Sequence, residues 1–136
     1  MLFRLSLLIL LSAVAATAQW GPCGAKKDEV LRLGQRIEKE LPLGSTESQV
    51  AKFLDEMHLV HGRSSEVPAG SARRYRKLLQ MGATIETPAH NEPAIYLQFF
   101  FDKRGRLVES VVDNACGLGC YSIRRNRSGV LRDNCF

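Results

Sequence analysis

A stretch of alternating side chains between residues 95 and 112 constrains the fold of this chain more than any other segment. Leu97, Phe99 and Phe101 alternate with Tyr96, Gln98 and Phe100. Turn-forming residues follow at positions 102–105, and a second segment rich in valine occupies residues 107–112. A run of period two that is joined to such a segment by a short turn containing glycine predicts an antiparallel β-hairpin.

Two more turns follow this hairpin. Residues 117–119 and 126–129 are rich in glycine, asparagine and serine, which favour turns. They separate two further short runs, residues 121–125 and 130–132, that have strand-like composition. The C-terminal half is therefore expected to form an antiparallel meander of three to four strands.

Helical periodicity precedes the meander. Within residues 26–41, Val30, Leu33, Ile37 and Leu41 recur at spacings of three and four, which places them on one helical face. Pro42 and Gly44 then interrupt the pattern. These features predict a first amphipathic helix.

A second helix is expected to begin at Thr46. This residue and Gln49, three positions later, form the pattern of a capping box. An apolar stripe follows at Val50, Phe53, Leu54 and Met57, and the helix should end near residues 61–62. The predicted fold class is thus α+β: two N-terminal helices packed on a C-terminal antiparallel meander, stapled by disulfides. Its expected core includes Val50, Phe53, Leu54, Leu97, Phe99, Val108 and Val112.

The N-terminus has the pattern of a secretory signal. Arg4 precedes an apolar stretch over residues 5–14, and the small residues Ala16, Thr17 and Ala18 follow. Because a membrane-spanning helix needs about twenty apolar residues, this stretch is too short to remain as an anchor. We expect cleavage near Ala18, a single domain over residues 19–136, a secreted or periplasmic location, and no integral membrane segment after cleavage.

The charge of the expected mature chain is uneven. Without Arg4, eighteen of the nineteen basic residues remain against fourteen acidic ones, a net charge of +4. Residues 19–61 contain six basic and seven acidic residues, whereas residues 62–136 contain twelve and seven. Such an asymmetry favours anionic partners. Export argues against nucleic acid as the partner.

Four cysteines remain after cleavage: Cys23, Cys116, Cys120 and Cys135. An even number in an exported domain favours two disulfides. If the turn at residues 126–129 pairs Arg125 with Val130, Cys120 lies opposite Cys135, at a separation that a disulfide tolerates. Cys23 would then pair with Cys116, and the competing arrangement joins Cys116 to Cys120. Without a Cys-x-x-Cys pair, a zinc site is not expected.

Basic side chains form the main candidate binding surface. They are clustered at residues 73–77, at residues 103–106 and at residues 124–127. If residues 73–79 form an edge strand, Arg74 and Arg76 share one face, and Arg73, Tyr75 and Lys77 share the other. Arginine suits phosphate and carboxylate groups; an alternative is that these residues only protect a sheet edge from aggregation. The candidate binding residues are Arg73, Arg74, Arg76, Arg104, Arg124, Arg125 and Arg127.

No catalytic or metal-binding pattern is found in the sequence. His58 and His61 are three residues apart, but two ligands are too few for zinc and no His-Glu-x-x-His motif is present. No serine lies in a Gly-x-Ser-x-Gly motif. The pairs Glu38 with Glu40 and Asp55 with Glu56 are better explained as solvated helix surface. No cofactor, no metal and no enzymatic activity are expected, unless histidines and carboxylates of the second helix meet in a deep pocket.

Two segments carry a resemblance to a known family. Residues 43–46 with Val50, Phe53 and Leu54 are similar to the glycine, capping hydroxyl and apolar helix of the SmpA/OmlA (BamE-like) small envelope domains. Residues 99–107 look like that family's aromatic strand, Asp/Gly turn and returning strand. The family's Gly-x-Pro after the second helix and its lipid-bearing cysteine are missing. The resemblance implies a helix-helix-sheet fold and a location in the cell envelope.

These observations predict a non-enzymatic binding or interaction module. It would dock through its basic surface on a protein or on an anionic envelope component. β-Lactamase inhibitor proteins use a similar helix-helix-sheet unit, so an inhibitor of a secreted hydrolase is the alternative function. A small envelope enzyme is the third.

Overall fold

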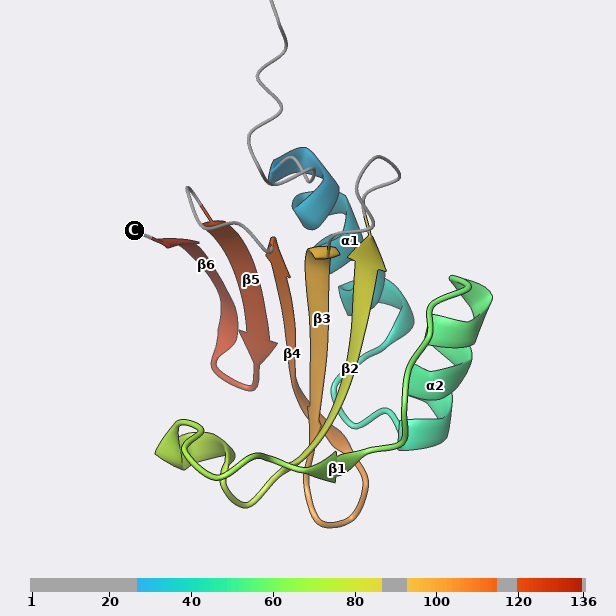
Figure 1. The fold of residues 1–136 in the computed structure, drawn as a ribbon, viewed down its shortest axis with the longest axis vertical. Coiled ribbons are helices and arrows are strands. Elements are labelled where there is room, and N and C mark those ends of the chain that lie inside the picture. Colours follow the sequence, from blue (N-terminus) through green and yellow to red (C-terminus); the bar gives the residue numbers. More distant parts are fainter. Residues whose placement is uncertain (1–26, 87–92, 115–119, 136) are drawn as a thin grey trace, which may run out of the picture.

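Two helices precede a six-stranded antiparallel sheet in the computed structural model, which describes residues 27–86, 93–114 and 120–135 (Figure 1). Each strand pairs with the next one along the chain, so the sheet is a simple meander in the order β1 to β6. The helices are α1 (Lys27–Glu40) and α2 (Glu47–Glu56). The strands are β1 (Ser65–Glu66), β2 (Leu79–Glu86), β3 (Pro93–Phe101), β4 (Leu107–Asn114), β5 (Cys120–Asn126) and β6 (Gly129–Cys135), with a short 3₁₀ helix η1 (Arg73–Tyr75) between β1 and β2.

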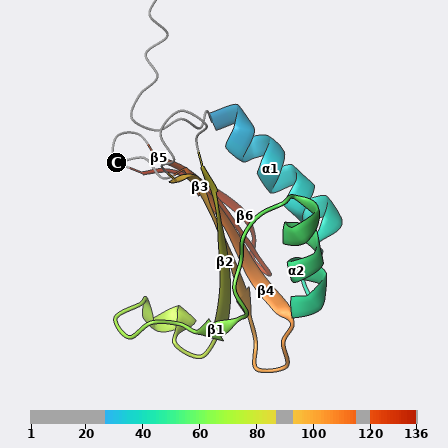
Figure 2. The same ribbon diagram turned by 45° about the vertical axis from the view of Figure 1, so that its right-hand side comes forward.

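Both helices cover the same face of the sheet. In the rotated view α1 and α2 lie on one side of the strands, and η1 lies on the other (Figure 2). The main core forms between the helices and the sheet, and its fully buried side chains include Val30, Ile37, Val50, Leu54, Leu97, Phe99, Phe101, Leu107 and Val112. We call the other side the helix-free face.

The first helix packs closely on the late strands. Val30, Leu33 and Ile37 are buried, as the helical spacing predicts. Between them lies Gly34, where an added Cβ would come within 2.8 Å of the Ile123 Cδ1 on β5. The missing side chain at Gly34 therefore lets α1 approach the sheet.

The second helix starts where the sequence predicts and stops earlier. Thr46 and Gln49 form the complete capping box. His58 adopts a left-handed φ of 57° and donates its backbone N–H to the carbonyl oxygen of Asp55, and the Leu59 N–H reaches that of Leu54. These two bonds form a Schellman motif, which ends the helix. The expected end near residues 61–62 is wrong because glycine, the usual residue at this position, is replaced by a histidine.

The connection before α2 is fastened to the sheet. Gly44, at a φ of 93°, donates its N–H to the Leu107 carbonyl oxygen at 2.7 Å. The Leu107 N–H in turn bonds to the Ser45 carbonyl oxygen at 2.8 Å. The start of α2 is thus held at the turn between β3 and β4.

The expected strand number is wrong, because the sheet has six strands rather than three to four. The two missed strands are β1 and β2. Residues 73–79, expected as an edge strand, form η1 and a turn, and β2 begins only at Leu79. β2 is hard to recognise in the sequence because the inward Ala83 is small and both Ala83 and the outward Gly82 are uncommon in strands, so large apolar side chains do not alternate with polar ones.

The last hairpin, β5–β6, has the predicted register. Arg125 pairs with Val130 and Cys120 with Cys135. One core assignment is wrong: the register shifts next to Phe101, which pairs with Leu107, while Phe100 pairs with Glu109. Val108 is the extra residue of this bulge and is only half-buried, and Leu107 takes the core position instead.

The expected disulfides are not found among the residues that the structure describes, and the predicted cysteine pairings stay predictions. Cys23 and Cys116 lie outside those residues. Cys120 and Cys135 are described only by their backbone, as partners in the β5–β6 ladder. Within the described ranges, neither helix has the length and apolar character needed to cross a membrane.

Candidate binding surface

Three chain segments that carry exposed basic residues meet at one end of the sheet. Strand register places them there: the start of β2 at Leu79 pairs with Phe101, and Phe101 pairs with Leu107, so the approach to β2 lies beside the β3–β4 turn. The β5–β6 turn begins at Asn126, which pairs with Glu109 on β4. One open groove is lined by residues from all three segments: Leu78, Asp102, Val108, Asn126, Arg127 and Ser128.

We call this region the basic end. Its exposed cations are Arg73, Arg74, Arg76 and Lys77 around η1, Lys103, Arg104 and Arg106 at the β3–β4 turn, and Arg127 at the β5–β6 turn. Besides Glu109, whose charge is balanced by Arg124, three carboxylates lie nearby, those of Asp102, Glu47 and Glu66. Eight cations against three carboxylates leave a formal excess of five positive charges.

The carboxylate of Asp102 is engaged by the turn itself. Its Oδ1 accepts hydrogen bonds from the backbone N–H groups of Arg104, at 2.9 Å, and Arg106, at 3.0 Å. Arg106 also donates from its guanidinium to the Gly44 carbonyl oxygen, at 3.3 Å. The turn is thereby held in one conformation, and the side chain of Arg104 is left exposed.

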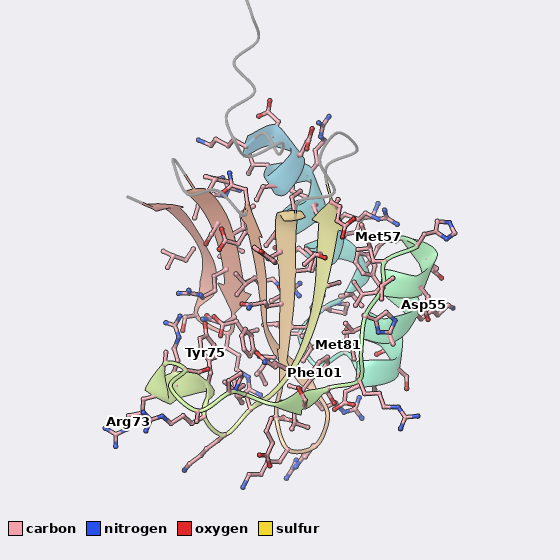
Figure 3. All side chains as sticks on the ribbon, in the orientation of Figure 1. Asp55, Met57, Arg73, Tyr75, Met81 and Phe101 are labelled. Atoms are coloured by element: carbon pink, nitrogen blue, oxygen red, sulfur yellow. The ribbon has the colours of Figure 1, made fainter. Side chains whose placement is uncertain are left out.

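Tyr75 attaches η1 to the helix-free face. Its ring stacks on that of Phe100, with centroids 4.2 Å apart and planes 11° apart. Its hydroxyl donates to Glu109 Oε1 at 3.3 Å, and the Arg74 guanidinium lies over the ring at 4.6 Å. Figure 3 shows Tyr75 directed from η1 toward the strands and Arg73 directed away from them. Tyr75 thus covers Phe100, which is buried although it points away from the helices.

Arg124 is used inside the fold. Its Nε forms an ion pair with Glu109 Oε1 at 3.1 Å, and the Glu109 side chain is only 8% exposed. Arg124 also lies near Asp113, where burial raises the pKa of the carboxyl and the positive charge of Arg124 opposes that rise. This arginine neutralises carboxylates on the helix-free face and contributes little to the exposed set.

Arg125 lies on the opposite face, beneath α1. It is buried and donates from Nη2 to the Leu41 carbonyl oxygen at 2.6 Å and from Nη1 to that of Glu38 at 3.3 Å. These carbonyls belong to the C-terminal end of α1, where backbone acceptors lack helical partners and a positive charge is favourable. Burial lowers the pKa of Arg125, opposed by the charge of Glu38.

The structure therefore divides the seven candidate arginines. Arg73, Arg74, Arg76, Arg104 and Arg127 are exposed at the basic end, whereas Arg124 and Arg125 serve the two faces of the sheet. The expected face assignment of residues 73–77 by strand alternation is wrong, because η1 is helical. The anchoring role of Tyr75 has no signal in the sequence, since its partners Phe100 and Glu109 are distant along the chain.

The histidines at the end of α2 do not form a metal site with other ligands in the described part of the chain, where no cluster of three potential metal ligands is found. His61 Nε2 contacts Asp55 Oδ1 at 2.8 Å, and its Nδ1 contacts the Gly62 carbonyl oxygen at 2.9 Å. The bond to Gly62 and then the bond to Asp55 raise the pKa of His61. His58 is exposed on the helix end, and the open groove beside His61 is lined by neither His58, Asp55 nor Glu56.

Comparison with known proteins adds no relative: no protein-family model matches this chain, and neither a curated protein nor a solved structure matches it.

Proposed function

We propose that this chain is a secreted or periplasmic, non-enzymatic binding module that docks on an anionic partner through its basic end. The observation that carries the proposal is the convergence of three separate segments, each with exposed arginine, on one groove. Guanidinium groups bind carboxylates and phosphates through paired hydrogen bonds, and clustered charge raises the rate of encounter.

The rigidity of the basic end supports this proposal. η1 is held by the stack of Tyr75 on Phe100, and the β3–β4 turn is held by Asp102. Cations on a fixed frame lose less conformational freedom on binding than cations on a loose tail. Arg124 and Arg125 are bound to partners within the fold, so the arginines that stabilise the fold differ from those that would bind the partner.

The proposal is tested with poly-glutamate as the anionic probe. One variant reverses one cation in each segment: Arg73→Glu, Arg104→Glu and Arg127→Glu. The control variant reverses three exposed cations on the helices, Arg32→Glu, Lys39→Glu and Lys52→Glu, so that both variants have the same net charge. Titration calorimetry at low and raised salt measures binding.

We expect the parent and the helix variant to bind at low salt with affinity that falls as salt rises. The basic-end variant should lose binding under the same conditions. Equal loss in both variants would mean that only net charge matters, and salt-independent binding would contradict electrostatic docking.

A further inference from the structure

The two edges of the sheet differ in how they are protected. At one edge, β1 pairs with only Leu79 and Gln80, and His61 forms an isolated bridge to Ala83, so the outer side of β2 is partly covered. At the other edge, no strand among the described residues pairs with the outer side of β6. β6 runs for seven residues, contains no proline and keeps one register with β5 throughout.

Natural proteins commonly block such an edge with charged side chains, especially lysine, with proline, with a bulge or with a very short strand. β6 has no lysine, no proline and no bulge and is seven residues long, and its two charged residues, Arg132 and Asp133, are of opposite sign. Within the described ranges no residue pairs with its outer backbone N–H and C=O groups, which can bond to another extended chain in the same manner as in the rest of the ladder.

Two exposed apolar side chains lie on this strand. Val130 is 44% exposed and Leu131 is 52% exposed. Val130 pairs with Arg125, so it lies on the helix-bearing face, and Leu131 pairs with Arg124, so it lies on the helix-free face. An added strand would cover one of them from each side.

The strand also starts at the basic end. Gly129, its first residue, follows Arg127 and Ser128 of the groove that joins the three basic segments. Every strand pair in this sheet is antiparallel, so an added strand that continues the pattern runs toward the basic end. Residues beyond the C-terminal end of that added strand would meet the exposed arginines.

From these four observations we propose that the partner is an acidic segment of a protein, which binds as a seventh strand along the outer edge of β6 and places its carboxylates on the basic end. This inference rests on the proposed function and adds the chemical class of the partner. It also predicts a polarity: in the bound segment, the strand-forming residues precede the acidic residues.

Synthetic peptides test the polarity. The first peptide has six alternating valine and threonine residues followed by four glutamates, and the second has the same composition with the glutamates first. Fluorescence polarisation measures the affinity of each for the full chain. We expect the first peptide to bind roughly tenfold more tightly than the second, equal to about 1.4 kcal/mol. Equal affinity, or no binding of the first peptide at low salt, would overturn the inference.

A variant with Val130→Lys and Leu131→Lys separates strand addition from attraction alone. Both residues are exposed, so the substitutions are compatible with folding, and they add positive charge. Electrostatic attraction alone predicts equal or tighter binding of the first peptide, whereas strand addition predicts roughly tenfold weaker binding because lysine blocks sheet edges. Amide hydrogen exchange in β6 should slow when the first peptide binds to the parent chain, and unchanged exchange would contradict the seventh strand.

The outcomes distinguish the two proposals. If the lysine variant binds as tightly as the parent but the basic-end variant does not bind, strand addition is wrong and electrostatic docking remains. If the basic-end variant binds the peptide as tightly as the parent, the proposed function itself is wrong. Tighter binding to phosphatidylglycerol vesicles than to the first peptide, unaffected by the lysine substitutions, would assign the basic end to lipid and overturn the protein segment.

Discussion

Tyr75 stacks on Phe100 with ring centroids 4.2 Å apart, and this contact fixes the basic segment around η1 to the helix-free face of the sheet. Replacement by alanine removes the stack and uncovers Phe100. Tyr75→Ala should lower the free energy of unfolding by about 1 to 2 kcal/mol. Urea denaturation measures the change, and proteolysis near residues 67–78 should become faster.

Tyr75→Phe is the matched control for that variant. It keeps the ring and removes the two hydrogen bonds of the hydroxyl, a long one of 3.3 Å to Glu109 and one of 2.8 Å from the exposed Arg74 guanidinium. Its cost should stay below about 1 kcal/mol. A loss as large as that of the alanine variant would assign the stabilisation to the hydroxyl instead of the stack.

Arg125 should behave as a structural residue although it belongs to a basic cluster of the sequence. Arg125→Ala leaves the carbonyl oxygens of Leu41 and Glu38 without their charged donor. We expect a loss of about 2 to 3 kcal/mol in the free energy of unfolding. The exposed Arg127→Ala should change it by less than about 0.5 kcal/mol. Similar effects of the two substitutions on chemical denaturation would contradict this division.

The pH dependence of stability should report the contacts of His61. Because the pKa of His61 is raised in the folded chain, its contribution to stability is fully present below its ordinary value of 6.5 and is lost as pH rises through the folded-state pKa. The difference in unfolding free energy between the parent and His61→Gln should therefore shrink with rising pH. Chemical denaturation across this range measures it. The His61 resonances should titrate above pH 6.5, and Asp55→Asn should move that titration downward.

His58 holds a conformation that suits glycine. At its φ of 57°, a residue with a Cβ destabilises the folded backbone by about 1 to 2 kcal/mol, and glycine avoids this cost. Part of that gain is lost because glycine gives the unfolded chain more conformational freedom. His58→Gly should raise the free energy of unfolding by about 0.5 to 1 kcal/mol. His58→Ala keeps the backbone penalty and should bring no gain in a parallel thermal melt. Stabilisation by alanine as well would show that the imidazole, not the backbone, is unfavourable.

Processing of the N-terminus is a separate prediction. Intact mass and N-terminal peptide analysis of the protein from its native host should give a chain that begins at Gln19. A product that retains residues 1–18 would contradict the predicted export.

Local interactions made part of this fold predictable. The capping box depends on Thr46 and Gln49, three residues apart, and the pairing of Arg125 with Val130 depends on one tight turn. Each is decided by neighbours along the chain. The sequence pattern therefore identifies the start of α2 and the register of the last hairpin correctly.

Contacts between distant residues limited the rest. The sequence of β2 has no strong alternation, and what defines this segment as a strand is its pairing with β3. The roles of Tyr75 and Arg125 depend on partners far away in the chain. The basic clusters at residues 73–77 and 124–127 therefore looked like parts of one surface, although Tyr75 anchors η1 to the sheet and Arg125 binds the C-terminal end of α1. The exposed part of the candidate site could be predicted from composition, and its internal part could not.

The bond between Arg125 and Leu41 joins residues 84 positions apart. Since α1 packs on β4 and β5, the apolar stripe of the first helix has no cover until most of the chain is present. Closing so long a loop slows folding. During synthesis or export, the apolar stripe of α1 therefore stays exposed to chaperones until the β5–β6 hairpin has emerged.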